Sequence, residues 1–331
     1  MGKTWAPHAA AALAGISAGA AFLFGAGDLA LASQPAPAGT IHNPVSVDVG
    51  IMVTAVVAAA VGSKPLRDRL ARVIPIDSDS PVHALALALA VILLGTQLSS
   101  LLFTDVLAAG GSGSPLTLVD LLAQELPFAI VAAAGVGMFM RRNLGSSAVR
   151  LGLIVPEWWQ VVLALAAAGA FFAFGQAVGA LGQWLTPETA QRVQSTSQHL
   201  FGNLAGGPGI VALALGPGIC EEVLFRGALQ PRIGLVATAV LFTSVHSEYG
   251  LSLDLAAILV LALGLGLIRK TCNTTTSSLC HVTYNLTVGI GIAGSLIGWA
   301  VALEIALVAL TGYGLYWRAR QIEATKLESP L

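Results

Sequence analysis

The chain has 331 residues, of which 56% are hydrophobic and only 10% are charged, and its mean hydropathy is +0.81. A soluble domain carries about a quarter charged residues, so this chain has too few to cover a water-exposed surface, and we expect an integral membrane protein. The formal net charge of −1 and the lack of a Lys/Arg-rich helix face exclude nucleic acid as a partner. Its three cysteines contain no CxxC pair, which argues against a disulfide framework or a thiolate metal site.

Apolar runs long enough to cross a bilayer, about 20 residues each, divide the chain into about ten predicted helices. The first run is longer than the apolar region of a signal peptide and lacks a cleavage site, so we interpret it as a retained span. The sequence therefore predicts an all-α, polytopic transmembrane helix bundle. The predicted spans lie near residues 8–32, 46–62, 82–104, 117–140, 160–184, 209–230, 233–249, 252–268, 277–297 and 299–317.

Basic residues fall in every second connection between these spans. Because Lys and Arg near span ends mark the cytoplasmic side, both termini are predicted to be cytoplasmic. The intervening loops, among them the Pro/Gly-rich external loop 33–45, contain only Arg192. Trp158, Trp159 and Trp317 are expected as anchors at the membrane interface. The basic residues that alternate are Lys3, Lys64, Arg67, Arg69, Arg72, Arg141, Arg142, Arg150, Arg232, Arg269, Lys270, Arg318, Arg320 and Lys326.

Four single acidic residues, Asp28, Asp120, Glu125 and Glu304, lie in or at the ends of predicted spans. A charged side chain at the centre of a span costs about 2.5–3.5 kcal/mol, so each needs a compensating partner or a function. Two interpretations remain open for each: an interfacial position or structural hydrogen bond, and the lining of a polar cavity.

The sixth predicted span carries an unusual cluster over residues 216–227, GPGICEEVLFRG. A proline flanked by glycines should kink the helix and free a backbone carbonyl. Glu222 and Arg226 are four residues apart with the acid first, the favourable order for an ion pair on one helix face. Glu221 is rotated by about 100° from Glu222. The spacing therefore predicts a structural Glu222–Arg226 pair and leaves Glu221 available for chemistry, unless the whole cluster is a structural acidic patch.

Two further spans carry imidazoles. The seventh ends in Phe242 and His246, and the ninth begins with His281 and Asn285, which share a helix face through their i,i+4 spacing. An interfacial position would explain His246 alone, and an interhelical hydrogen-bond pair would explain His281 and Asn285. Two carboxylates, two imidazoles and a carboxamide on three neighbouring helices nevertheless favour water activation. The topology places Glu221 toward the cytoplasmic side and His246 near the outer end of a short span, so His246 reaches the site only if the seventh helix is short, tilted or re-entrant.

These ordered motifs resemble the CPBP family of intramembrane proteases. The family includes the type II CAAX prenyl endopeptidases and bacterial proteins linked to bacteriocin processing and self-immunity. The resemblance extends over roughly residues 150–317, while the first 145 or so carry no family signal. The motifs are Glu-Glu-x-x-x-Arg (Glu221, Glu222, Arg226), Phe-x-x-x-His (Phe242, His246) and His-x-x-x-Asn (His281, Asn285).

The resemblance implies a membrane-embedded protease core of roughly eight helices, in which water attacks a peptide bond. It implies that Glu221 is the base, assisted by His246, and that His281 and Asn285 stabilise the oxyanion. Glu222, Arg226 and Phe242 would support the helices.

The family was long described as metalloproteases, so a divalent metal such as zinc, held by Glu221, His246 and His281, is the alternative to a metal-free site. HExxH is absent, because Ser247 and Glu248 follow His246, and we favour the mechanism without a cofactor. Cys220 lacks a neighbouring base and electropositive surroundings, which disfavours it as a nucleophile.

Two other classes of function remain as alternatives: a transporter with a buried acid/His proton relay and a non-catalytic membrane scaffold. The favoured prediction is an endopeptidase of a bacterial plasma membrane, with a leader peptide or membrane-protein terminus as substrate and the lipid bilayer as its surroundings. The expected organisation is N-terminal helices of unassigned role over 1–146, a protease core over 147–318 and a cytoplasmic tail over 319–331.

Overall fold

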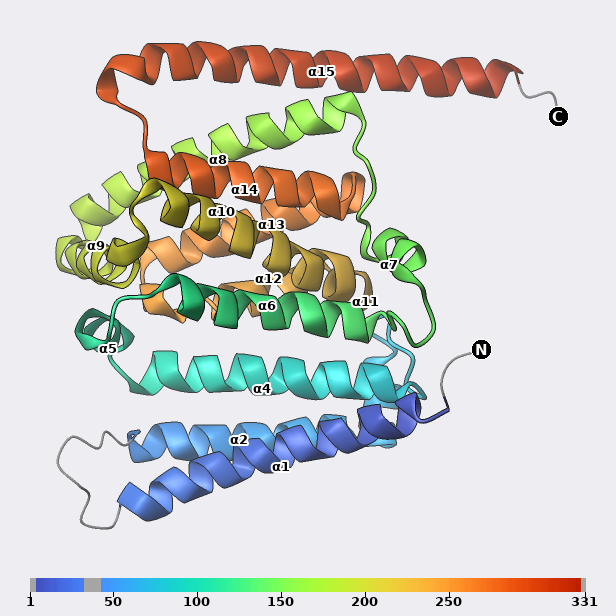
Figure 1. Cartoon of the computed structure of the whole chain (residues 1–331), viewed down its shortest axis with the longest axis vertical. Coiled ribbons are helices and arrows are strands. Elements are labelled where there is room, and N and C mark those ends of the chain that lie inside the picture. Colours follow the sequence, from blue (N-terminus) through green and yellow to red (C-terminus); the bar gives the residue numbers. More distant parts are fainter. Residues whose placement is uncertain (1–3, 33–42, 329–331) are drawn as a thin grey trace.

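The computed structural model describes residues 4–32 and 43–328, and these ranges are helical, without a β-strand. The predicted all-α class is therefore confirmed. The predicted external loop 33–45 and Lys3 lie mostly or wholly outside the described residues. Figure 1 shows the helices running side by side as one bundle.

Every predicted span coincides with a helix. The helices are α1 (Ala6–Ala32), α2 (Val45–Val61), α4 (Pro81–Phe103), α6 (Leu118–Gly135), α8 (Trp158–Leu185), α10 (Gly207–Glu222), α12 (Leu235–Ser244), α13 (Leu253–Thr271), α14 (Thr274–Ile290) and α15 (Ile297–Glu328). Short helices connect them: α3 (Lys64–Leu70), α5 (Val106–Ser112), α7 (Leu144–Leu151), α9 (Pro187–Phe201), α11 (Gln230–Ile233), and the single turns η1 (Gly202–Leu204), η3 (Ser247–Tyr249) and η4 (Gly294–Leu296). The helix expected over 299–317 is longer than predicted, because α15 continues to Glu328.

Fewer helices meet the requirements for a full span than the sequence predicted. Within the described ranges six are long and apolar enough, or seven if α2 and α3, which meet at 84°, count as one broken span. The helix α12 has 10 residues and is about 15 Å long, half the thickness of a hydrocarbon core. The helix α13 carries charged residues near both ends. The chain is a multi-pass membrane protein in which several helices of the core are shorter than a bilayer.

Successive connections between the helices lie at alternate ends of the bundle, and the connections that carry the basic residues share one end, as the sequence predicts. In Figure 1, α1 begins and α15 ends at the same end of the bundle, where α3, α7 and α11 also lie. The predicted anchors meet at this end: the Trp158 and Trp317 ring centroids are 6.0 Å apart, and the Arg318 guanidinium lies 5.0 Å from the Trp159 ring. Which end faces the cytoplasm stays a prediction.

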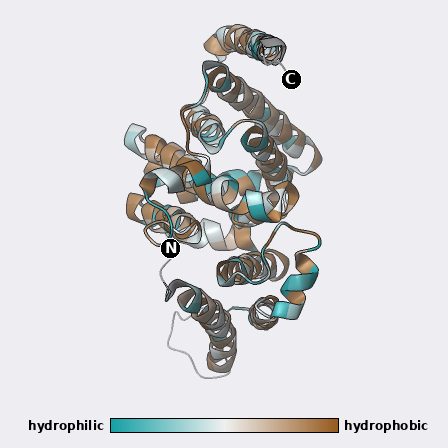
Figure 2. Ribbon diagram, turned by 90° about the vertical axis from the view of Figure 1, so that its right-hand side faces the viewer, coloured by the Kyte–Doolittle hydropathy of each residue, from teal (hydrophilic) through white to brown (hydrophobic). Residues whose placement is uncertain are grey.

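The bundle has two packing groups. The helices α1, α2 and α4 pack on one another. The second group, which carries the three sequence motifs and their neighbours, consists of α6, α8, α10, α12, α13 and α14, with α15 against α8. Figure 2 shows hydrophobic residues along most of the length of the helices, as expected for a bundle within lipid. The helix α6 belongs to the N-terminal region by sequence but packs against α10.

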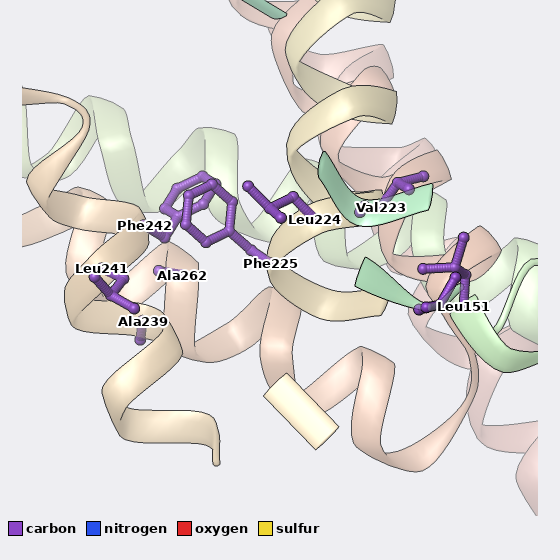
Figure 3. Close-up of a cluster of buried hydrophobic side chains, with 10 residues drawn as sticks. Leu151, Val223, Leu224, Phe225, Ala239, Leu241, Phe242 and Ala262 are labelled. Carbon is purple, nitrogen blue, oxygen red and sulfur yellow. The ribbon is translucent and has the colours of Figure 1, made fainter. Parts of the chain in front are cut away.

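The largest buried apolar cluster lies where α12, α13 and the segment after α10 meet. Figure 3 shows Phe225 and Phe242 together in this cluster, with Leu241 and Ala262 nearby. The ring centroids of Phe225 and Phe242 are 5.3 Å apart in an edge-to-face arrangement, which stabilises such pairs by about 0.5–1.5 kcal/mol beyond area burial. Polar residues of the motifs lie against this cluster, since the Arg226 guanidinium and the His246 ring both contact Phe242.

Candidate active site

The helix α10 positions both glutamates and passes through Pro217. Proline has no N–H, so the carbonyl of Leu213, four residues earlier, lacks its helical partner. The amide Nδ2 of Asn285 donates to this carbonyl at 3.3 Å. The predicted free carbonyl is thus present, and the residue that satisfies it is one of the candidate site residues.

Close packing fixes α10 against α14. Gly218 faces the backbone of Val282, and a methyl group at Gly218 would lie 2.5 Å from Val282 Cγ2 and 2.9 Å from its backbone nitrogen. The hydroxyl of Ser278 donates to the Gly218 carbonyl. The absence of a side chain at Gly218 therefore brings the motifs of the two helices together.

After Glu222 the chain changes to π-helical winding over η2 (Val223–Leu229). Such segments are rare and frequently occur at functional sites. Arg226 Nη1 lies 3.0 Å from Glu222 Oε1, a charge contact rather than an aligned hydrogen bond. Both side chains are almost completely buried, with 1% and 0% exposed.

Glu222 is the centre of a buried polar network. Its Oε2 accepts from the hydroxyl of Ser277, and Nδ1 of His281 lies 3.2 Å from its Oε1. Because a carboxylate only accepts, Nδ1–H of His281 is the donor. His281 is therefore oriented by Glu222, not by Glu221, and its Nε2 remains for other contacts.

Phe242 lies between the charged groups of the network and the second imidazole. The Arg226 guanidinium is 4.0 Å from its ring centroid, and its ring centroid lies 4.8 Å from that of His246 and 5.9 Å from that of His281. A guanidinium over a desolvated aromatic face is stabilised by up to about 2 kcal/mol. Phe242 therefore joins the three motifs physically.

His246 lies two residues after the end of α12, whose short length brings it within the bundle, where it interacts electrostatically with Glu125 of α6. Its Nδ1 lies 2.9 Å from the carbonyl oxygen of Phe242, so Nδ1–H donates, and in the neutral ring Nε2 carries the lone pair. His246 and His281 interact electrostatically.

Glu221 is 4% exposed, so its carboxylate does not face the lipid. Its Oε2 is buried and has no hydrogen-bond partner in the described part of the chain. The charged groups that act on it include Arg226 and Glu222. A buried carboxylate oxygen without a partner is costly and is typical of a group kept ready for a ligand or a reaction.

The single acidic residues have different surroundings. Asp120 caps the start of α6 through Thr117, Asp28 accepts from the backbone N–H of Asn43, and Glu304 on α15 lies against Gly169 of α8. Glu125 is 6% exposed and interacts electrostatically with Glu221 and His246. The sequence marked Glu125 only as an acid within a span, because no motif connects it with the other groups.

A bound metal ion requires several donor groups that converge on one point. Within residues 4–32 and 43–328, no group of three or more His, Cys, Asp or Glu side chains is arranged to hold a metal ion. The alternative set of Glu221, His246 and His281 therefore does not form a ligand cage in this structure, and we derive no step through a metal. The thiol of Cys220 lies beside Glu125 and Glu221, surroundings that are electronegative and unsuited to a thiolate nucleophile.

The structure thus brings His246 and His281 close to Phe242, and Glu221 close to the Glu222–Arg226 pair, with Asn285 one turn beyond His281. In comparison with known proteins, residues 205–287, which contain all three motifs, match the family described as type II CAAX prenyl endopeptidase Rce1-like. No curated protein and no solved structure matches the chain. The match supports a membrane peptidase. The resemblance to the CPBP family is therefore confirmed, and the segment 205–287 is Rce1-like.

Proposed function

We propose that the protein is an intramembrane endopeptidase in which Glu221 activates a water molecule. The observation that carries the proposal is the buried carboxylate of Glu221, which has an unpartnered oxygen in the described part of the chain and lies beside the Glu222–Arg226 pair. Positioned proton transfer of this kind accelerates a reaction by about 10²–10⁴-fold.

The tautomer of His246 suits an assisting role. With Nδ1–H donated to the Phe242 carbonyl, the lone pair on Nε2 accepts a hydrogen bond from the same water that Glu221 deprotonates. Two acceptors, one charged and one neutral, orient the water oxygen toward the substrate carbonyl.

The oxyanion that forms would lie near His281. Because Nδ1–H of His281 donates to Glu222, its Nε2 donates to an oxyanion only when the ring is an imidazolium. Glu222 supplies a negative charge that favours this form, whereas Arg226 on the same carboxylate opposes it. The developing oxyanion supplies the second negative charge that the imidazolium and Arg226 together require. Asn285 uses one N–H for the Leu213 carbonyl and keeps the second for the oxyanion.

The proposed substrate is a leader peptide or the terminus of a membrane protein, because the site lies among short helices within the bundle. The family suggests CAAX-type substrates as the first to be tested. We propose a location in a plasma membrane with both termini in the cytoplasm, and a protease core over residues 147–318.

The test uses purified protein in liposomes with a library of quenched fluorescent peptides, including prenylated CAAX peptides. We expect Glu221→Gln to lower kcat/KM by about 10²–10⁴-fold, whereas the control Glu304→Gln, a second acid within the membrane, retains activity. Unchanged cleavage by Glu221→Gln would refute the proposal. A rate that a chelator abolishes and zinc restores would refute its metal-free mechanism.

A further inference from the structure

A carboxylate from outside the Rce1-like segment reaches the candidate site. Glu125 lies on α6, 80 residues before the match begins at residue 205. The residue is buried, with only 6% of its surface exposed. Gly216 on α10 makes room for it: a methyl group there would lie 3.4 Å from Glu125 Cγ. The two helices therefore approach each other where one lacks a side chain and the other carries an acid.

The surroundings of Glu125 are those of the site. The charged groups that act on it are Glu221 and His246, and it also acts on the thiol of Cys220. Its Oε2 is buried without a hydrogen-bond partner in the described ranges, as is Oε2 of Glu221. A structural acid within a membrane would be expected to use such an oxygen for a helix-to-helix hydrogen bond.

Aromatic contacts hold this part of α6 in place. Phe128 is three residues after Glu125 and so lies on the same helix face. Its ring packs edge-to-face on Phe225 at 5.8 Å, and Phe225 packs on Phe242, which contacts His246. Glu125 is thus fixed relative to the motif residues through a continuous chain of rings.

Two carboxylates that share a buried site cannot both be ionised, because like charges in a low dielectric repel strongly. Arg226 acts on Glu221 but is not among the groups that act on Glu125. Glu222 and Glu248 oppose the charge on Glu221, and His246 favours a charge on Glu125, so these interactions do not divide the proton between the two acids. The proposed function requires an ionised Glu221, which places the single proton of the pair on Glu125. Pairs with such opposite states supply the acid and the base of a reaction.

We propose that Glu125 is the general acid of the site, a catalytic residue that protonates the leaving nitrogen. The inference rests on the proposed function of Glu221. Glu221 takes a proton from water as the water oxygen bonds to the substrate carbonyl carbon. The carbon–nitrogen bond then breaks and the carboxylic acid of Glu125 gives its proton to the nitrogen. Transfer of the proton from Glu221 to Glu125 restores the starting state, so one water is consumed and no other reactant is needed.

The test separates proton donation from structure by changing the leaving group. The best peptide of the library is prepared as the amide and as an ester with an acidic alcohol at the same bond, because such an alcohol leaves without protonation. For Glu125→Gln we expect kcat for the amide to fall by about 10²–10⁴-fold with little change in KM, while kcat for the ester falls less than about 10-fold. Glu221→Gln should lose both activities, and Glu304→Gln neither.

Equal losses for amide and ester in Glu125→Gln, or no loss for either, would overturn the inference. If this variant does not purify as folded protein, Glu125→Asp gives the same ratio, since a shortened acid should slow the amide more than the ester. Cleavage that survives Glu221→Gln would instead refute the proposed function and is distinguishable from both results.

Discussion

Removal of the Arg226 guanidinium tests how the buried network is held together. Arg226 contacts Glu222 at 3.0 Å, donates to the Ala262 carbonyl at 3.3 Å and lies 4.0 Å from the Phe242 ring centroid. Breaking one partner of a buried ion pair costs about 3–5 kcal/mol, because the other charge remains without compensation. We therefore expect Arg226→Met to lower the apparent free energy of unfolding by about 3–5 kcal/mol.

The assay is titration with SDS in mixed micelles, followed by far-UV circular dichroism. The matched control is Arg318→Met, whose exposed pair with Glu157 at 3.4 Å should contribute about 1 kcal/mol or less. The double variant Glu222→Gln/Arg226→Met should be more stable than Arg226→Met, since no buried charge is left unpaired. A loss below about 1 kcal/mol in Arg226→Met, or a double variant less stable than the single one, would refute this reasoning.

Further predictions concern packing, helix capping and pH. Gly218→Ala should cost about 1–3 kcal/mol in the same titration and lower peptide cleavage, because the new methyl group forces α10 away from Val282; wild-type behaviour would show that this approach is not needed. Asn285→Leu should lower the free energy of unfolding by about 1 kcal/mol less in a Pro217→Ala background than in wild type, because the Leu213 carbonyl regains its helical partner in that background. Equal costs in both backgrounds would exclude the capping role. The Ala108 backbone N–H and the Arg192 guanidinium lower the pKa of Asp105, which lies outside the spans, below its ordinary value of 3.8. The charged carboxylate therefore stabilises the fold above pH 3.8, and this stabilisation is lost as the pH falls through the lower pKa of the folded state. The melting temperature of wild type should therefore decrease more steeply than that of Asp105→Asn below pH 3.8, and parallel curves would contradict this assignment.

Much of the fold was predictable because membrane spans have a strong compositional signal. Each predicted span contains a helix, and the alternation of basic connections agrees with the two ends of the bundle. The number of complete spans was not predictable to the same degree, because an apolar run such as 233–249 includes α12, η3 and a turn. Hydropathy measures lipid compatibility and does not mark where such a run changes direction.

The site was predictable within each helix and less so between helices. Spacing placed Glu222 and Arg226 on one face, and the two side chains are in contact. Spacing does not specify how two helices are rotated about each other, so the pairing of His281 with Glu222 could not be derived from it. The contact of Asn285 with a carbonyl near Pro217 and the position of Glu125 depend in the same way on tertiary packing.

The π-helical winding of η2 has a consequence for how this chain tolerates insertions and deletions. Wider winding accommodates an extra residue relative to a regular helix, so loss of a single residue between 223 and 229 would permit an ordinary α-helix. The backbone would become more regular, yet every side chain downstream would turn to a new direction and the Arg226 guanidinium would leave its aromatic neighbour. The number of residues in η2 therefore matters as much for the site as the chemical identity of Glu221 and Glu222.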